Sequence, residues 1–187
     1  MEEQRNEKTQ FIVDIAKIVF FALLIIVPVR YFIVQPFFVE GASMEPNYHD
    51  GDYLLVDKLS YLVGEPSRGD VIVFRFPQNP DKIFIKRVIG LPGETVVIDR
   101  GSVYIENAEH PEGFELNEPY LDEVTGQSVR TPLEDDEYFV MGDNRDASYD
   151  SRGWGSLNER FLIGRVLLRA WPVADAQLIA SPSYSIQ

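Results

Sequence analysis

The stretch that decides the fold is Ile83-Phe84-Ile85-Lys86-Arg87-Val88-Ile89, which is followed by the turn Leu91-Pro92-Gly93-Glu94. A short run rich in β-branched and aromatic residues, bounded by a proline-glycine turn, is typical of a β-strand. After residue 36 the same pattern recurs, and it predicts further strands at residues 52–56, 71–76, 95–98, 103–105, 138–141 and 164–171. We therefore expect residues 37–187 to form a mainly β domain of folded-over antiparallel sheets.

Composition limits what this domain can do. The chain has 187 residues and no cysteine, which allows one domain with a real core and excludes thiol catalysis, thiolate metal sites and disulfides. Its net charge of -13 makes nucleic acid an unsuitable partner, because phosphate binding needs a basic face. No metal or organic cofactor is indicated, and we expect the protein to work as a monomer.

Much of the acidity is concentrated in residues 106–137, where eleven carboxylates stand against one base, Arg130. No spacing typical of a calcium-binding loop or of a metal-ligand set occurs there. We interpret this stretch as a solvated insertion in the β domain and assign it no chemistry.

Residues 11–34 form one long apolar block. As a helix they would extend about 36 Å at roughly 1.5 Å per residue, enough to cross a hydrocarbon core of about 30 Å. Asp14, Lys17 and Arg30 flank the uncharged centre and would lie near the interfaces, and Asp14 can pair with Lys17. We predict one transmembrane helix, with residues 1–36 as tail and anchor.

Two other interpretations of this block are weaker. A buried core helix would carry a polar stripe, which residues 18–29 lack. A removable signal peptide would end at a small-x-small site, whereas residues 28–32 are bulky. Basic residues lie on both sides of the block, so charge fixes the orientation only weakly, and a cytoplasmic amino terminus is the expectation.

Ser43 lies in Gly41-Ala42-Ser43-Met44-Glu45-Pro46, nine residues beyond the apolar block. A hydroxyl is a weak nucleophile until a neighbouring base takes its proton. The two histidines, His49 and His110, lie in a turn-like and a loop-like setting, so neither is a convincing base, although a Ser-His-Asp triad is compatible with the order. Taken alone, the segment could also be a turn that enters the first strand.

Three lysines follow the apolar block, Lys58, Lys82 and Lys86, and only Lys86 lies in a continuous apolar run. In a strand, Phe84 and Val88 share its face, so apolar neighbours could lower the pKa of its ammonium and make it a base. The alternative is a surface lysine whose stem covers apolar side chains. The strand pattern does not separate the two.

A third segment, Gly142-Asp143-Asn144-Arg145-Asp146-Ala147-Ser148-Tyr149-Asp150-Ser151-Arg152-Gly153-Trp154-Gly155, is unusually polar. It has more hydrogen-bonding capacity than a simple connecting loop requires. A structural loop tied by Asp-Arg pairs would explain part of this composition.

Together these segments resemble the bacterial type I signal peptidases of the single-anchor kind. The resemblance rests on the anchor, Ser43-Met44-x-Pro46, Gly51-Asp52, Lys86 through Gly93, and Gly142 through Gly155, in the family's order. It implies a membrane-bound serine endopeptidase that removes signal peptides from exported preproteins, cutting after small side chains at positions -1 and -3. It also implies a single-pass protein of the plasma (inner) membrane, with the catalytic domain on the outer face and the lipid bilayer as a partner.

The resemblance further implies that Ser43 is the nucleophile and Lys86 the general base, with Ser148 hydrogen-bonded to the lysine amine. The Ser43 N–H would help to hold the oxyanion. Some members have a serine as second donor where this chain has Gly41, so that donor stays open between the Gly41 backbone and a water. Asn47 replaces the family's usual threonine and can still bond the backbone. The implied supporting residues are Arg87, Asp143, Arg145, Asp150 and Arg152, and the implied pocket walls are Phe37, Val39, Met44 and Ile85.

Two rival functions are compatible with the same residues. One is a specialised Ser/Lys processing peptidase, including a self-cleaving domain of the SOS-repressor type, which the anchor and the lack of a DNA-binding module disfavour. The other is a catalytically silent, membrane-tethered β domain for binding, which the presence of Ser43, Lys86 and Ser148 together disfavours.

Overall fold

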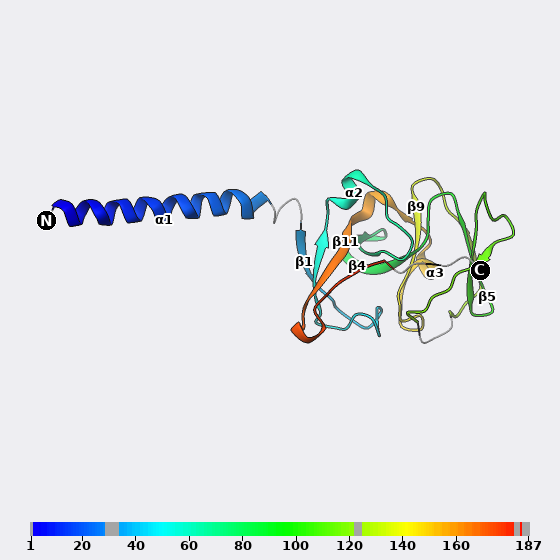
Figure 1. Ribbon diagram of the computed structural model, residues 1–187. Coiled ribbons are helices and arrows are strands. Elements are labelled where there is room, and N and C mark those ends of the chain that lie inside the picture. The colour runs from blue at the N-terminus through cyan, green and yellow to red at the C-terminus, as the bar shows by residue number, and fades with distance from the viewer. Residues whose placement is uncertain (1, 29–33, 122–124, 182–183, 185–187) are drawn as a thin grey trace.

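The computed structural model describes residues 2–28, 34–121, 125–181 and 184. It begins with a long helix, α1 (Glu2–Pro28), which extends away from the strands in Figure 1. The large apolar side chains described on α1 are exposed, and the predicted ion pair joins Lys17 Nζ to Asp14 at 3.4 Å. Across the described ranges, no helix combines the length and apolar character that crossing a membrane requires. The predicted anchor includes residues 29–33, which lie outside the described residues.

The larger of two sheets has eight strands in the order β1-β2-β11-β3-β4-β9-β10, with β12 paired to β11, and all its recorded pairs are antiparallel. Its strands are β1 (Val34–Phe38), β2 (Tyr53–Asp57), β3 (Val71–Phe76), β4 (Asn79–Gly90), β9 (Glu137–Met141), β10 (Leu157–Asn158), β11 (Leu162–Trp171) and β12 (Gln177–Leu178). Four short helices connect them, namely α2 (Ser60–Val63), α3 (Ser151–Trp154) and the 3-10 turns η2 (Glu159–Phe161) and η3 (Val173–Asp175). The predicted mainly β, antiparallel fold is confirmed.

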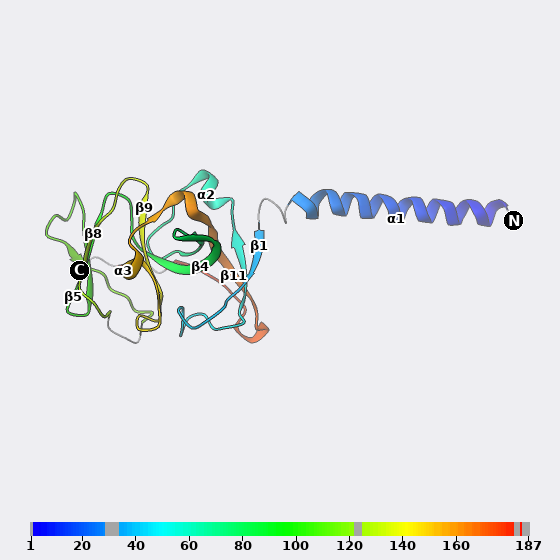
Figure 2. The ribbon, with the colours of Figure 1, turned by 180° about the vertical axis from the view of Figure 1, so that it is seen from behind.

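The smaller sheet lies at the end of the domain opposite α1, where β5 and β8 are seen in Figure 2. Its order is β7-β6-β5-β8, formed by β5 (Thr95–Asp99), β6 (Ser102–Glu106), β7 (Phe114–Glu115) and β8 (Val129–Pro132). The tight turn predicted between residues 99 and 102 joins β5 to β6 as a hairpin.

The acidic stretch is not the solvated insertion that we expected. Strands β7 and β8 come from residues 106–137, and Leu116, Thr125 and Leu133 of this stretch are buried. The carboxylates lie mostly in turns and at exposed positions, whereas the apolar side chains between them pack into the core that joins the two sheets. The high density of carboxylates in the sequence gives no indication of these buried apolar side chains.

All seven predicted strands are present, with ends that differ by a few residues. The strands that we missed, β1, β7, β8, β10 and β12, are five residues long or shorter. The expected domain boundary at residue 36 falls inside β1, which pairs with β2 along its whole length. Strand β1 is therefore part of the β domain, including residues 34–36, which we had assigned to the anchor.

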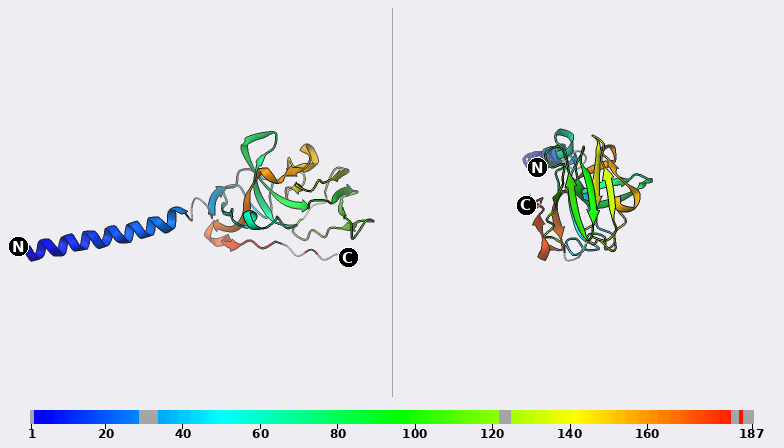
Figure 3. Two further views of the ribbon diagram at one scale, coloured as in Figure 1. Left: turned by 90° about the horizontal axis from the view of Figure 1, so that it is seen from above. Right: turned by 90° about the vertical axis from the view of Figure 1, so that its right-hand side faces the viewer.

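Two apolar clusters set the positions of the segments singled out above. One, which includes Met44, Tyr48 and Leu54, packs beneath residues 39–52. Another, which includes Ile89 and Val96, joins the larger sheet to the smaller one. The views in Figure 3 show β12 beside β11, and Tyr184, farther along the chain, packs against the cluster that joins the two sheets.

Candidate active site

Ser43 lies in a loop, residues 39–52, whose two ends are hydrogen-bonded to each other. The Val39 N–H donates to the Asp52 carbonyl at 2.9 Å, and the Gly51 N–H donates to the Val39 carbonyl at 2.9 Å. The side chains of Met44 and Tyr48 are buried in the core below the loop. The closed ends and the two buried side chains hold Ser43 half-buried at the surface.

Lys86 lies in β4, and its side chain meets the loop. Only 4% of the residue is exposed, so the alternative of a surface lysine is wrong. Its Nζ donates to Ser43 Oγ at 2.7 Å and to the Ile85 carbonyl at 2.8 Å. Burial lowers the pKa of the Lys86 ammonium from 10.5 to about 8, against the opposing charges of Asp150 and Asp143. A neutral amine is therefore available next to the hydroxyl at mildly alkaline pH.

A groove of about 730 Å³ opens over this pair. Its lining includes Ser43, Lys86 and three of the four expected pocket walls, Phe37, Val39 and Ile85. The fourth, Met44, was wrongly predicted as a wall, because its side chain points into the core and is 1% exposed. The other lining residues are Phe38, Glu40, Gly41, Ala42, Leu54, Val73, Asp81, Lys82, Ile83, Phe84, Ala147 and Tyr149.

No hydrogen bond between Ser148 and Lys86 is recorded, contrary to expectation. Its Oγ is buried and has no hydrogen-bond partner among the described residues. Both hydrogen bonds recorded for Lys86 Nζ go to residues other than Ser148. The Ser148 side chain instead lies against Gly142. The packing is so tight that a Cβ on Gly142 would clash with the Ser148 side chain and with the Ser43 carbonyl. The Asn144 N–H, from the same loop as Ser148, donates a hydrogen bond to the Ser43 carbonyl at 3.1 Å.

Gly41 has its backbone N–H engaged. That N–H donates to Asp50 Oδ1 at 2.8 Å, so it is not free to act as a second oxyanion donor. Gly41 has φ +86°, a backbone conformation that favours glycine. Among the described residues, no hydrogen-bond acceptor is recorded for the Ser43 N–H, so this donor is not engaged.

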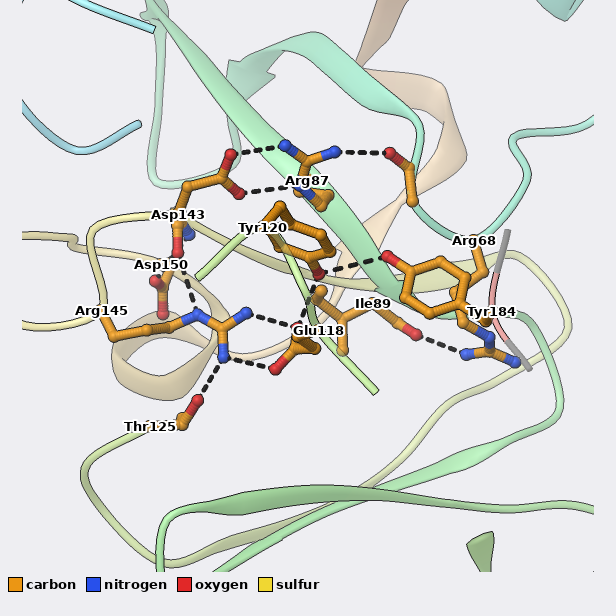
Figure 4. Close-up of polar contacts among 12 residues, drawn as sticks. Arg68, Arg87, Ile89, Glu118, Tyr120, Thr125, Asp143, Arg145, Asp150 and Tyr184 are labelled. Carbon is orange, nitrogen blue, oxygen red and sulfur yellow. Dashed lines mark hydrogen bonds and ion pairs between the residues drawn. The ribbon is translucent and has the colours of Figure 1, made fainter. Parts of the chain in front are cut away.

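The expected supporting residues form buried ion pairs, and Figure 4 draws Arg87 with Asp143 and Arg145 with Glu118. Arg87 binds Asp143 through two nitrogens, at 2.8 and 2.5 Å. Arg152 binds Asp150, and its Nη2 also donates to the Arg145 carbonyl at 2.6 Å. Although burial raises the pKa of Asp150, the bonds and charge of Arg152 together with the Gly142 N–H lower it overall, so this carboxylate stays charged. It also caps α3 by accepting from the Arg152 N–H.

Several contacts to these pairs were not predicted. Glu118, from the acidic stretch, binds Arg145 through both carboxylate oxygens. Tyr120 stacks on Arg87, with 4.1 Å between the guanidinium carbon and the ring centroid. Asn47 bonds the backbone as expected, at the Tyr120 carbonyl, and also bonds Asp143. A tyrosine among carboxylates gives no local sequence signal for such a role.

Neither histidine is part of this arrangement. His49 is exposed, and the His110 ring packs on Phe114, 5.3 Å between centroids, in the smaller sheet. No hydrogen bond from either ring to Ser43 is recorded among the described residues.

Comparison with known proteins decides the family. A family model described as "Signal peptidase, peptidase S26" matches residues 12–171. The chain belongs to the signal peptidase family, peptidase S26. The predicted resemblance is confirmed, as is the prediction of a hydrolase of the signal peptidase I type.

Related signal peptidases match most of the chain. It is 38% identical over 164 residues to the signal peptidase I of Leptolyngbya laminosa, which covers 83% of this chain and 78% of that protein. It is 34% identical over 175 residues to the signal peptidase I of Bacillus licheniformis, covering 87% of this chain and 90% of that protein. A solved signal peptidase I from Enterococcus faecalis aligns at 32% identity over 56% of this chain and 98% of that chain, with a TM-score of 0.48.

Proposed function

We propose that this protein is a membrane-bound endopeptidase that removes signal peptides with Ser43 as nucleophile and Lys86 as general base. The observation that carries the proposal is the 2.7 Å contact between Lys86 Nζ and Ser43 Oγ, made by a lysine whose pKa burial lowers to about 8. With the amine neutral, this contact lets the hydroxyl donate its proton to Nζ.

The reaction then has two halves. Ser43 Oγ attacks the scissile carbonyl as its proton passes to Lys86 Nζ, and the tetrahedral intermediate collapses to an acyl-enzyme. The Lys86 ammonium gives that proton to the departing amine. Water then enters, loses a proton to the neutral Lys86 and attacks the acyl carbon, and Lys86 returns that proton to Ser43 Oγ as the acyl group leaves.

The oxyanion is held by the Ser43 N–H. A preorganised donor of this kind contributes roughly 2.7 to 4 kcal/mol to transition-state binding. Because the Gly41 N–H is bonded to Asp50, a water is the second donor that we favour. We keep Ser148 as a support for Lys86 in the substrate complex, since its buried hydroxyl lacks a partner here and such a group favours acquiring one.

Substrate binding is supported by a strand edge in the groove. The recorded pairing of β4 with β9 covers residues from Arg87 onward, so the edge at Ile83 to Ile85, which lines the groove, can pair with an extended peptide. Alternate side chains of that peptide would face Phe37, Val39 and Ile85. We propose that these walls limit positions -1 and -3 to small side chains.

Residues 11–34 are proposed to hold the enzyme at the plasma membrane, with the amino terminus in the cytoplasm and the β domain outside, working as a monomer. The exposed apolar side chains of α1 support this. Flotation with liposomes tests it: the full chain should rise with the vesicles, whereas a chain that begins at Val34 should lose most of this binding. Equal flotation of the two chains would contradict the anchor.

The function is tested by incubating the enzyme with a purified preprotein and measuring the mass of the new amino terminus. We expect a single cut directly after a small-x-small sequence. Cleavage elsewhere would favour the specialised processing peptidase, and an intact preprotein would contradict the proposal.

A further inference from the structure

Tyr120 lies in the acidic stretch, yet it contacts neighbours of both proposed catalytic residues. Its ring covers the guanidinium of Arg87, which follows Lys86 in β4. Its carbonyl accepts a hydrogen bond from Asn47 Nδ2 at 3.0 Å, and Asn47 belongs to the loop that carries Ser43. One residue therefore links the strand of the base to the loop of the nucleophile.

The Arg87 side chain is fixed on every side that the structure describes. Its edge is bound by both oxygens of Asp143, and its Nη1 donates to the Gly69 carbonyl at 3.0 Å. Tyr120 covers one face, and 5% of the residue is exposed. A planar guanidinium held both at its edge and on its face has little freedom to rotate. The backbone of β4 next to Lys86 is therefore restrained as well.

The loop of the nucleophile is joined to the same group. Asn47 Nδ2 donates to Asp143 Oδ2 at 3.0 Å, so Asp143 receives bonds from Arg87 and from the loop. The Asn47 carbonyl in turn accepts from Arg169 of β11. Without the Tyr120 ring, Arg87 would lose its cover, and the backbone carbonyl that accepts from Asn47 would lose the side chain that fixes its position.

Tyr120 is itself held in place, as Figure 4 shows. Its hydroxyl lies 2.7 Å from Glu118 Oε1 and 3.1 Å from the hydroxyl of Tyr184. Glu118 binds Arg145, whose Nε donates to the Gly142 carbonyl at 3.1 Å. Burial raises the pKa of Tyr120 well above its ordinary value, so the hydroxyl stays a donor. The position of the Tyr120 ring is therefore set by Glu118, two residues before it, and by Tyr184 near the C-terminus.

We infer that Tyr120 is a positioning residue that fixes the separation of Ser43 and Lys86 by covering Arg87 and holding Asn47. This inference rests on the proposed function. Tyr120 touches neither reacting atom, so its effect is on geometry. Because misplacement of reacting groups by about 1 Å can cost about a hundredfold in rate, a partial release of the two elements should be visible in kcat.

The test compares the steady-state kinetics of Tyr120→Leu and Tyr120→Phe in the full chain. We expect Tyr120→Leu to lower kcat about tenfold or more with KM within about twofold, because the groove is unchanged. Both variants keep the backbone carbonyl that accepts from Asn47, but only Tyr120→Phe keeps an aromatic ring over Arg87, so it should recover most of that loss. The matched control is Tyr104→Leu on β6, a half-buried tyrosine of the smaller sheet, which should leave kcat unchanged.

A wild-type kcat in folded Tyr120→Leu would overturn the inference, as would a loss of kcat as large in Tyr104→Leu. If Tyr120→Leu does not fold, Asn47→Ala decides: it removes the bonds from the loop to the Tyr120 carbonyl and to Asp143 while leaving the ring over Arg87. This variant should lower kcat with KM unchanged, and a wild-type kcat would overturn the inference. Ser43→Ala separates this question from the proposed function. Full activity in Ser43→Ala would sink the function, whereas an inactive Ser43→Ala beside a fully active Tyr120→Leu would sink only the positioning role.

Discussion

Lys86 Nζ lies 2.7 Å from Ser43 Oγ, although 43 positions separate the two residues in the sequence. Two separate parts of the fold, a strand and a loop, bring these atoms together. Strand β4 carries Lys86 in the larger sheet, and the loop of residues 39–52, closed at its ends and packed on Met44 and Tyr48, brings Ser43 over it. Lys86 is buried, and no carboxylate among the described residues is bonded to it, which keeps its neutral form accessible.

The pH dependence of activity should follow Lys86. Since burial lowers its pKa to about 8, the neutral fraction grows as pH rises through that value. We expect kcat/KM to rise about tenfold per pH unit below the pKa and to level off above it. A profile measured with a signal peptide substrate checks this, and a rate that still climbs near the free-lysine value of about 10.4 would show that Lys86 is not desolvated.

Gly142→Ala should reduce activity strongly. The added Cβ would clash with the Ser148 side chain and the Ser43 carbonyl, so the nucleophile must shift. We expect kcat to fall at least about tenfold. Gly126→Ala is the matched control, because no heavy atom lies within 4 Å of its added Cβ. Similar kcat values for the two variants would contradict the close packing at Gly142.

Asp143→Asn should destabilise the domain, because it leaves the buried guanidinium of Arg87 without its opposite charge. We expect a loss of roughly 3 kcal/mol or more in the free energy of unfolding, measured by urea denaturation. The control is Glu106→Gln. Glu106 also binds an arginine, Arg130, through two hydrogen bonds, but this pair lies at the surface, where water and salt screen it. Little change is expected there, and an equal loss in both variants would argue against burial as the cause.

The strands and the catalytic candidates were predictable because their signals are local. β3 was predicted to the residue, since a run of apolar β-formers between turns leaves little choice. Lys86 stood out as the one outer lysine inside such a run. Whether it was buried could not be decided from the strand alone, because burial depends on Ser43 and its loop, which are distant in sequence.

What could not be predicted depends on long-range packing or on side-chain direction. Met44 follows Ser43 directly, and only the turn of the loop decides that its side chain points into the core. The strands of the acidic stretch, β7 and β8, are short and have weak local strand propensity. They are stabilised instead by pairing with β6 and β5. Tyr120 acquires its contacts with Arg87, Asn47 and Tyr184 only when the two sheets are assembled.

The most direct test of the central claim is the cleavage rate of a purified preprotein by Lys86→Met, compared with Lys58→Met, the same change at an outer lysine that does not line the groove. Lys86→Met should lose at least about two orders of magnitude in kcat, the range in which loss of a general base falls, while Lys58→Met stays near wild type. Lys86→Met should remain folded, because burial already penalises the Lys86 ammonium and an apolar methionine of similar length fills the same space without that penalty. Wild-type turnover by a folded Lys86→Met enzyme would contradict the account.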